Sequence, residues 1–314
     1  MPKAQDTFEI VIPVYNEIGI IAESINKIVT EVKKLSSYKT TIILVDDGSS
    51  DGTWDVVKNI RKSFLKNKSL SISIETLRLS RNFGKDAAIF AGLKHSKEEL
   101  VMVMDADCQH PPDLIKDFLL LQKQNGFDVV NGVKNKSQNT SLIYKSLSWV
   151  FNKFLALVLK TDFSGASDFK LLNRRAVNAL CECGDQNFFF RGLAIWIGFS
   201  QGYIKFDVQN RIDSQTKWTK IALFKYAVDT IVLFSHIPVY LILLLGIFSI
   251  LLAAAIVLKL AFSFTTGTIP TGYATVVMLL ILNLGFSMLS IGSVGLYVKN
   301  TLDQTKNRPR YFII

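Results

Sequence analysis

Two aspartates, Asp105 and Asp107, directly follow the apolar segment 101–104, and Gln109 comes two residues later. Side chains at positions i and i+2 of an extended chain point to the same side, so these three groups can converge on one point. Mg²⁺ and Mn²⁺ prefer oxygen ligands, and Mg²⁺ usually takes one or two carboxylates and leaves its other positions to water and substrate phosphates. The spacing is therefore compatible with a metal site that holds a diphosphate, although paired carboxylates at a strand end are more often a solvated turn.

Three further polar clusters follow predicted strands. Residues 13–17 (Pro-Val-Tyr-Asn-Glu) come after the first strand and precede a helix start. Asp46 and Asp47 follow the second predicted strand, where their carboxylates could accept hydrogen bonds from a nucleobase or a ribose. A capped turn explains residues 49–53, but it does not explain two adjacent carboxylates after a buried strand. Arg78 and residues 80–85, which include Arg81 and Lys85, bring positive charge suited to phosphate oxygens.

The elements that must position these groups alternate along the chain. Apolar and β-branched runs predict strands at 8–14, 41–45, 72–79, 100–104 and 127–132, and helical spacing predicts helices at 20–35, 53–64, 85–94 and 112–124. This alternation predicts an α/β fold, a mainly parallel sheet with helices on both faces. Ligands of such sheets bind outside the carboxyl ends of the strands, where all four clusters lie.

The last third of the 314-residue chain has a different composition. Between Asp229 and Lys299 the only charged residue is Lys259. Within this region Ile237–Leu258 and Ala274–Val298 are each long enough to span a hydrocarbon core about 30 Å thick as helices. A pair of buried helices in a soluble fold is the alternative, but so little charge over this length favours membrane spans.

The predicted organisation has four parts. Residues 1–218 form the α/β domain, 219–235 an amphipathic helix at the membrane interface, 236–298 two spans (about 237–260 and 273–298), and 299–314 a tail. Lysines and arginines flank both spans while the connecting segment has no charge, which predicts that both termini and the α/β domain are cytoplasmic. The chain begins with a few polar residues before its first strand, which predicts no signal peptide. A second amphipathic helix, 142–160, is predicted to pack on the sheet, with an interfacial position as the alternative.

The net charge of +10 raises the question of nucleic acid binding. No helix-turn-helix, zinc-finger or aromatic-basic RNA motif accompanies this charge, which argues against a nucleic-acid partner. In a chain with two predicted spans, a lipid bilayer with anionic headgroups is the simpler partner.

The ordered motifs resemble family 2 glycosyltransferases with a GT-A fold, and within them the polyprenyl-phosphate glycosyltransferases, namely dolichyl-phosphate mannose synthases and bacterial bactoprenol glucosyltransferases. The resemblance is carried by residues 11–17 (Val-Ile-Pro-Val-Tyr-Asn-Glu), 45–53 (Val-Asp-Asp-Gly-Ser-Ser-Asp-Gly-Thr), 80–85 (Ser-Arg-Asn-Phe-Gly-Lys) and 105–112 (Asp-Ala-Asp-Cys-Gln-His-Pro-Pro). Segments 164–171, 190–192 and 211–218 and the two apolar helices extend it over nearly the whole chain.

The resemblance implies a role for each matching residue. The sugar nucleotide would be bound by Pro13, Tyr15, Glu17, Asp46, Asp47, Arg81, Lys85 and Asp105, and the metal by Asp105, Asp107 and Gln109. Arg191, Arg211 and Lys217 would bind phosphates near the acceptor, and Asp168 would lie on the acceptor side. The family's usual Gly-x-Ser-Lys after the arginine, here Arg211, is replaced by Asp213-Ser-Gln-Thr-Lys217. The family pattern therefore does not predict the conformation of this loop.

The implied reaction is an inverting, Mg²⁺- or Mn²⁺-dependent transfer of a hexose from a nucleotide sugar, with UDP-glucose as the expected donor. The implied acceptor is polyprenyl (undecaprenyl) phosphate, and the implied location is the cytoplasmic face of a bacterial inner membrane. Two alternatives remain: a membrane-bound glycosyltransferase acting on a hydroxyl acceptor, and a non-catalytic two-span scaffold. Small residues between Gly285 and Gly295 are compatible with a homo-oligomer.

Overall fold

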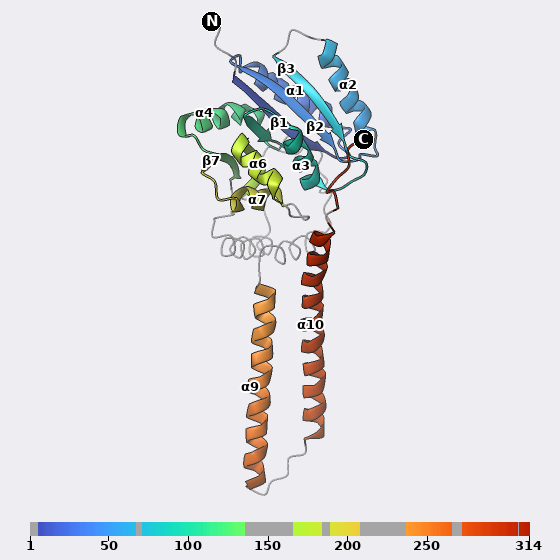
Figure 1. The fold of residues 1–314 in the computed structure, drawn as a ribbon, viewed down its shortest axis with the longest axis vertical. Helices are drawn as coiled ribbons and strands as arrows, with labels where there is room; N and C mark the ends of the chain where they lie inside the picture. Colours follow the sequence, from blue (N-terminus) through green and yellow to red (C-terminus); the bar gives the residue numbers. More distant parts are fainter. Residues whose placement is uncertain are drawn as a thin grey trace. The chain divides into compact units, whose positions relative to one another are not determined.

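The computed structural model describes residues 6–66, 71–107, 109–135, 166–183, 189–207, 237–265, 272–306 and 308–314. The chain divides into two compact units. Unit 1 comprises Met1–Lys217 together with Arg308–Ile314, and unit 2 comprises Trp218–Asn307. Figure 1 shows the course of the chain through both units.

Unit 1 is built on a sheet whose described strands follow the order β3-β2-β1-β4-β6-β5-β7. All neighbouring strands pair in parallel except β6, which is antiparallel to both β4 and β5. The predicted α/β fold with a mainly parallel sheet is therefore confirmed. The strands are β1 (Asp6–Val14), β2 (Tyr38–Asp46), β3 (Ile72–Arg78), β4 (Leu100–Val103), β5 (Val129–Lys134), β6 (Ala166–Asn173) and β7 (Gln201–Phe206).

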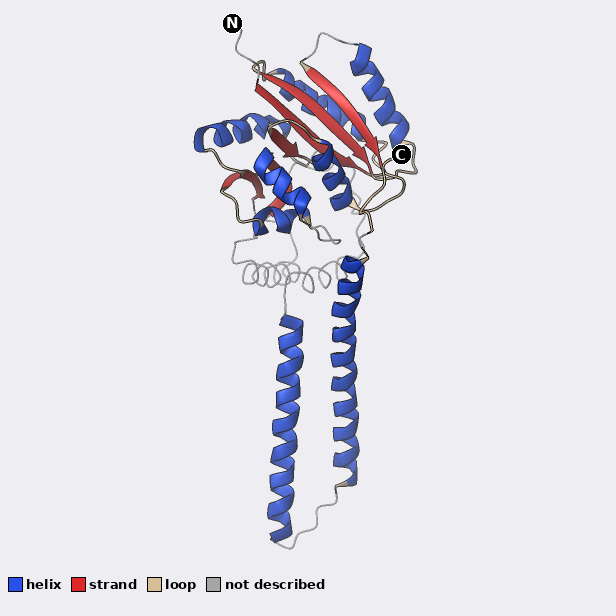
Figure 2. Ribbon diagram, in the orientation of Figure 1, coloured by secondary structure: helices blue, strands red, loops and turns tan. Residues whose placement is uncertain are grey.

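Helices cover both faces of this sheet, as the alternating sequence pattern predicts (Figure 2). On one face, the even-numbered side chains of β1 (Phe8, Ile10 and Ile12) join a core with α1 (Ile21–Lys33), α2 (Thr53–Lys66) and α4 (Ile115–Asn125). The short helix η1 (Pro112–Leu114) leads into α4. On the other face α3 (Lys85–His95) contacts β1 and β2, and it also contacts α6 (Arg174–Glu182) and α7 (Phe190–Trp196).

The sequence patterns predict no element for residues 161–218, yet β6, α6, α7 and β7 lie there. Strand β6 is buried along most of its length although it contains Asp168 and Lys170. These charged residues interrupt the apolar run that marks the other central strands, so periodicity alone does not reveal β6. The predicted amphipathic helices 142–160 and 219–235 lie outside the described residues.

Unit 2 contains two long helices, α9 (Ile237–Thr265) and α10 (Tyr273–Thr305), which contact each other. They contain the two segments predicted as spans. In the part of the chain that the structure describes, no helix is long and apolar enough to be assigned as a membrane span. The predicted tail 299–314 begins later than expected, because α10 continues to Thr305 and residues 308–314 belong to unit 1.

Helix α3 approaches the sheet closely at Gly92. A Cβ atom added at this glycine would lie 2.3 Å from Cγ1 of Val11 and 3.2 Å from Cγ2 of Val45. Both valines belong to fully buried strand segments, so neither can move aside into solvent. The glycine therefore sets the distance between α3, whose first residue is Lys85, and the strands beneath it.

We predict that Gly92→Ala lowers the free energy of unfolding by about 1–3 kcal/mol, the usual cost of overpacking a core. Thermal unfolding of the full-length protein measures this change. Gly19→Ala is the matched control, because a Cβ there meets no atom within 4 Å. Adding Val11→Ala to the Gly92→Ala variant should recover part of the lost free energy of unfolding. If the losses of the two single variants simply add in the double variant, the close approach of residue 92 to Val11 is contradicted.

Candidate active site

The turns that follow β1 and β2 are joined by hydrogen bonds. Asn16, whose φ is +52°, donates its backbone N–H to Ser49 Oγ, and its Oδ1 accepts the N–H of Ser50, both at 2.9 Å. The N–H of Glu17 donates to Thr53 Oγ1 at 2.9 Å. Each turn thus holds the other, and both lie at the carboxyl ends of adjacent parallel strands.

Asp46 and Asp47 at the end of β2 are both buried, and each has its own partners. Asp46 forms an ion pair with Arg78 (Oδ2 to Nε, 3.4 Å) and accepts weak hydrogen bonds from the N–H of Ser49. Asp47 accepts the backbone N–H groups of Phe83 at 2.8 Å and Gly84 at 2.9 Å. Burial raises the pKa of Asp47 even though these two hydrogen bonds oppose the shift.

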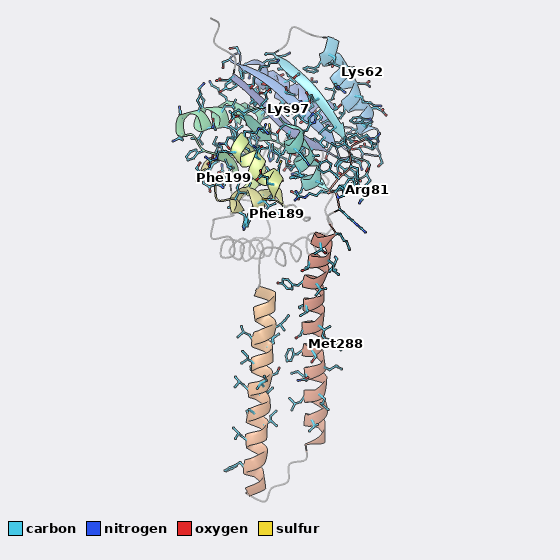
Figure 3. All side chains as sticks on the ribbon, in the orientation of Figure 1. Lys62, Arg81, Lys97, Phe189, Phe199 and Met288 are labelled. Carbon is cyan, nitrogen blue, oxygen red and sulfur yellow. The ribbon has the colours of Figure 1, made fainter. Side chains whose placement is uncertain are left out.

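The segment 81–84 lies directly against this strand end. A Cβ atom at Gly48, whose φ is +68°, would lie 2.5 Å from the backbone carbon of Arg81, so only glycine fits here. Arg81 itself is exposed and places its guanidinium 4.1 Å from the centre of the Phe83 ring. Figure 3 labels Arg81 at the edge of the domain. Its charge is therefore available to a ligand at this edge.

Lys85 joins two carboxylates that come from different strands. Its Nζ lies 2.7 Å from Oδ1 of Asp105 and 2.6 Å from Oδ2 of Asp168. The antiparallel register pairs Val103 with Lys170, so two residues further on Asp105 comes opposite Asp168. This explains how one ammonium group at the start of α3 reaches both.

Arg191 on α7 binds Asp168 from the other side. Its Nε lies 3.1 Å from Oδ1, and its NH2 nitrogen 3.0 Å from Oδ2, which makes a bidentate pair. Burial alone would raise the pKa of Asp168, but Lys85 and Arg191 outweigh it and hold this pKa well below its ordinary value. Asp168 is therefore a carboxylate at neutral pH and a weak base.

The Asp105–Gln109 segment carries the predicted metal ligands. Asp107 is partly exposed and its Oδ1 accepts the N–H of Gln109 at 3.1 Å. Burial alone would raise the pKa of Asp105, yet the ammonium group of Lys85 brings it below its ordinary value. Within the described residues, no group of three or more His, Cys, Asp or Glu side chains is arranged to hold a metal ion. Two carboxylates and an amide nevertheless suit Mg²⁺, which keeps several positions for water and phosphate.

His110 supports this segment, and the sequence patterns assign it no role. Its Nδ1 accepts the backbone N–H of Asp105 at 3.0 Å, and its buried ring stacks on Phe169 with centroids 5.0 Å apart. Nε2 lies 3.7 Å from Oδ2 of Asp105. Burial lowers the pKa of His110, so the ring is neutral at pH 7 and fixes the backbone of Asp105.

Two more titratable groups lie next to the Lys85 cluster and were not predicted as site residues. Asp86 accepts the N–H of Phe190 at 3.1 Å, and burial together with the charge of Asp168 raises its pKa to about 6. Lys170 is fully buried, donates to Oδ1 of Asn131, and burial lowers its pKa to about 7. Adjacency to Lys85 and the i+2 spacing from Asp168 were the available sequence signals.

The structure thus brings most of the predicted residues to one edge of the sheet. Lys85 and Asp105, predicted for the donor, form one ion-pair network with Asp168 and Arg191, predicted for the acceptor. Pro13 is buried within β1, so its side chain shapes the strand end, whereas Tyr15 is exposed and Glu17 partly buried. Arg211 and Lys217 lie outside the described residues.

A mainly parallel α/β sheet whose strand ends carry paired carboxylates and cations has the architecture of a GT-A-like enzyme. The sequence model of glycosyl transferase family 2 matches residues 9–193, which include every described residue of the network. The chain belongs to glycosyl transferase family 2, and it is a glycosyltransferase.

Relatives of similar length support this membership. CsbB of Bacillus subtilis (strain 168), named as a glycosyltransferase, is 36% identical over 98% of this chain and 92% of its own. The prophage bactoprenol glucosyl transferase homolog of Escherichia coli (strain K12) is 28% identical over 97% of both chains. Bactoprenol glucosyl transferase of Shigella phage SfX is 27% identical, also over 97% of both.

Two solved structures are similar to part of the chain. One is S. aureus TarS 1–349 in complex with UDP-GlcNAc, with a TM-score of 0.47 and 14% identity over 72% of this chain and 66% of that one. The other is glucosyl-3-phosphoglycerate synthase from Mycobacterium tuberculosis in complex with Mn²⁺, UDP-glucose and phosphoglyceric acid. Its TM-score is 0.45, with 18% identity over 72% of this chain and 78% of that one.

The raised pKa of Asp86 predicts a pH-dependent stability. A carboxyl group whose pKa is raised on folding stabilises the fold fully below its unfolded pKa, and this contribution is lost as pH rises through about 6. Asp86→Asn removes the charge but keeps an oxygen that can accept the Phe190 N–H. We therefore predict that the variant gains stability relative to wild type between pH 4.5 and pH 7.5, on the order of 1–3 kcal/mol.

Unfolding midpoints of both proteins across this pH range measure the effect. Asp117→Asn, on an exposed site of α4, is the control and should leave the pH profile unchanged. If the difference in stability between Asp86→Asn and wild type is the same at pH 4.5 and at pH 7.5, the raised pKa of Asp86 is contradicted.

Proposed function

We propose that this glycosyltransferase transfers a hexose, with glucose from UDP-glucose as the expected donor, to polyprenyl phosphate with inversion at C1. The observation that carries the proposal is the ion-pair network of Asp105, Lys85, Asp168 and Arg191. It joins a carboxylate expected to bind a metal with two cations that can bind phosphate. The names of relatives that align over nearly their full length, the bactoprenol glucosyl transferases, support the choice of acceptor.

The donor's nucleoside would lie at the ends of β1 and β2. Asp46 and Asp47 are held there by Arg78 and by the N–H groups of Phe83 and Gly84. Their oxygens can accept further hydrogen bonds from a base or a ribose, because each carboxylate offers about four acceptor positions. The exposed ring of Tyr15 lies on the adjacent turn and can cover the base.

The diphosphate would lie near Asp107, with a divalent metal bound by Asp107, Asp105 and Gln109. When bound, the metal neutralises charge that develops on the leaving diphosphate. Asp105 would contribute to this site while it forms an ion pair with Lys85. Arg81 and Lys85 supply fixed positive charge at the same edge, which favours the more negative transition state.

The acceptor phosphate would be held by Arg191, together with Arg211 and Lys217. A phosphomonoester has a second pKa near ~6, so it is largely ionised at neutral pH and needs no strong base to attack C1. This suits Asp168, whose low pKa makes it a poor base. Its role would be to orient Lys85 and Arg191, so that two anionic substrates are held within reacting distance.

The site would operate at a membrane surface, at the cytoplasmic face of a bacterial inner membrane. Helices α9 and α10 expose many large apolar side chains, among them Leu244, Leu258, Leu280 and Met288, the last labelled in Figure 3. Lipid contact, or contact with further copies of the chain in a homo-oligomer, would cover them. A polyprenyl phosphate presents its charged group at the bilayer surface, so such an anchor would keep the enzyme near its acceptor.

The test is a transfer assay with the purified full-length protein, labelled UDP-glucose, undecaprenyl phosphate and Mg²⁺ or Mn²⁺, with a chelator control. We expect metal-dependent label in an acid-labile lipid. Label only in a product with a hydroxyl acceptor would support the alternative acceptor class. No label with any nucleotide sugar would contradict catalysis altogether.

We predict that Asp107→Ala lowers transfer on the order of a hundredfold or more, because a metal-ligating carboxylate is lost. The unfolding midpoint should stay unchanged, since Asp107 is partly exposed and outside the core. Asp117→Ala, an exposed aspartate on α4, is the matched control and should retain full activity. Unimpaired turnover of the Asp107 variant across a metal titration would remove the metal assignment.

A further inference from the structure

The last residues of the chain return to unit 1 and extend its sheet at the edge. The N–H of Ile314 donates to the carbonyl of Arg78 at 3.0 Å, and the N–H of Ser80 donates to the carbonyl of Phe312 at 2.9 Å. Leu79 and Ile313 form the antiparallel bridge between these two bonds. Figure 1 shows the C-terminus beside the sheet at β3. The pairing covers the open edge just after β3, the outermost strand of the sheet.

These last residues, 310–314, are called the tail below. Their side chains contact elements near the strand ends where the donor is proposed to bind. The rings of Phe312 and Phe83 lie 6.4 Å apart, and those of Tyr311 and Phe90 lie 6.2 Å apart edge to face. Arg310 lies over Phe90, 4.3 Å from its ring centre, and donates to the carbonyl of Cys183 at the end of α6. The tail thus contacts residue 83, helix α3 and the end of α6.

The segment that the tail contacts is the one that holds Asp47. Backbone hydrogen bonds hold residues 78–84 against the end of β2. The N–H of Leu79 donates to the carbonyl of Asp46 at 2.8 Å, and the N–H groups of Phe83 and Gly84 donate to the carboxylate of Asp47. The tail contacts the same segment from Arg78 to Phe83 through backbone pairing and one ring contact. The first residue after the segment is Lys85, the centre of the ion-pair network.

We propose that residues 310–314 are a positioning element of the donor site. They hold the segment 78–84 against the end of β2, and so fix the carboxylate of Asp47 and the start of α3. The tail comes after α10 and the rest of unit 2 in the sequence, so the donor site depends on a segment that lies beyond unit 2 along the chain. This inference rests on the proposed function only in assigning Asp47 to nucleotide binding.

The consequence is specific to the donor. Loss of the tail removes one of the two sets of contacts that hold the segment 78–84. The hydrogen bonds to Asp46 and Asp47 remain, so the segment becomes less ordered and the fold persists. A ligand must then order the segment on binding, which lowers its affinity. The residues proposed for the acceptor side, Asp168 and Arg191, bind each other, and Asp168 also binds Lys85.

The experiment compares wild type, Phe312→Ala, and a truncation lacking residues 311–314. UDP affinity is measured by calorimetry, KM is measured separately for donor and acceptor, and the unfolding midpoint is recorded. We expect UDP affinity to fall and donor KM to rise about tenfold in the truncation, less in Phe312→Ala, with acceptor KM unchanged. Tyr203→Ala, which removes a similarly exposed ring from β7, is the control and should change none of these values.

Rescue separates positioning from general stability. A synthetic peptide of residues 308–314 added to the truncated protein should restore UDP affinity by pairing with the open edge. Unchanged UDP affinity and donor KM in both variants would overturn the proposal, as would equal losses for donor and acceptor with a lowered unfolding midpoint. Failure of the proposed function is distinguishable, because wild type would then show no UDP binding or no transfer.

Discussion

One ammonium group, that of Lys85, holds the candidate site together. It lies within ion-pair distance of Asp105 on the β4 side and Asp168 on β6, two carboxylates that would repel each other across the sheet without it. The Lys85 side chain is partly exposed; its partial desolvation would favour the neutral amine, yet the two carboxylates raise its pKa above the ordinary value. The site therefore depends on a charged lysine whose position is set by the start of α3.

Several features of the fold serve that position. Gly92 lets α3 lie close to β1, the antiparallel insertion of β6 brings Asp168 opposite Asp105, and Arg191 balances the second carboxylate. The same network connects the groups expected to bind the leaving diphosphate with those expected to bind the attacking phosphate. A transferase with two anionic substrates needs such a connection. Both substrates carry negative charge, so separate cations must bind each of them and hold the two within reacting distance.

The sequence predicted the parallel part of the fold well, because strands buried on both faces read as apolar runs followed by polar strand ends. It did not predict β6, since Asp168 and Lys170 interrupt its pattern, or the bridging role of Lys85, which depends on the antiparallel register. His110 and Asp86 act through burial and neighbouring charges, which spacing alone does not reveal. The docking of Tyr311 and Phe312 joins residues more than 200 positions apart in the sequence, and no local pattern encodes it.

A double-mutant cycle on kcat/KM for transfer, with Lys85→Met, Asp168→Asn and the combined variant, tests the central claim most directly. If one lysine serves both carboxylates, each single change already breaks the network, and the combined loss should be smaller than the product of the single losses by about tenfold or more. That factor corresponds to a coupling of about 1.4 kcal/mol. Losses that simply multiply would show that Lys85 and Asp168 act independently, and would contradict the account.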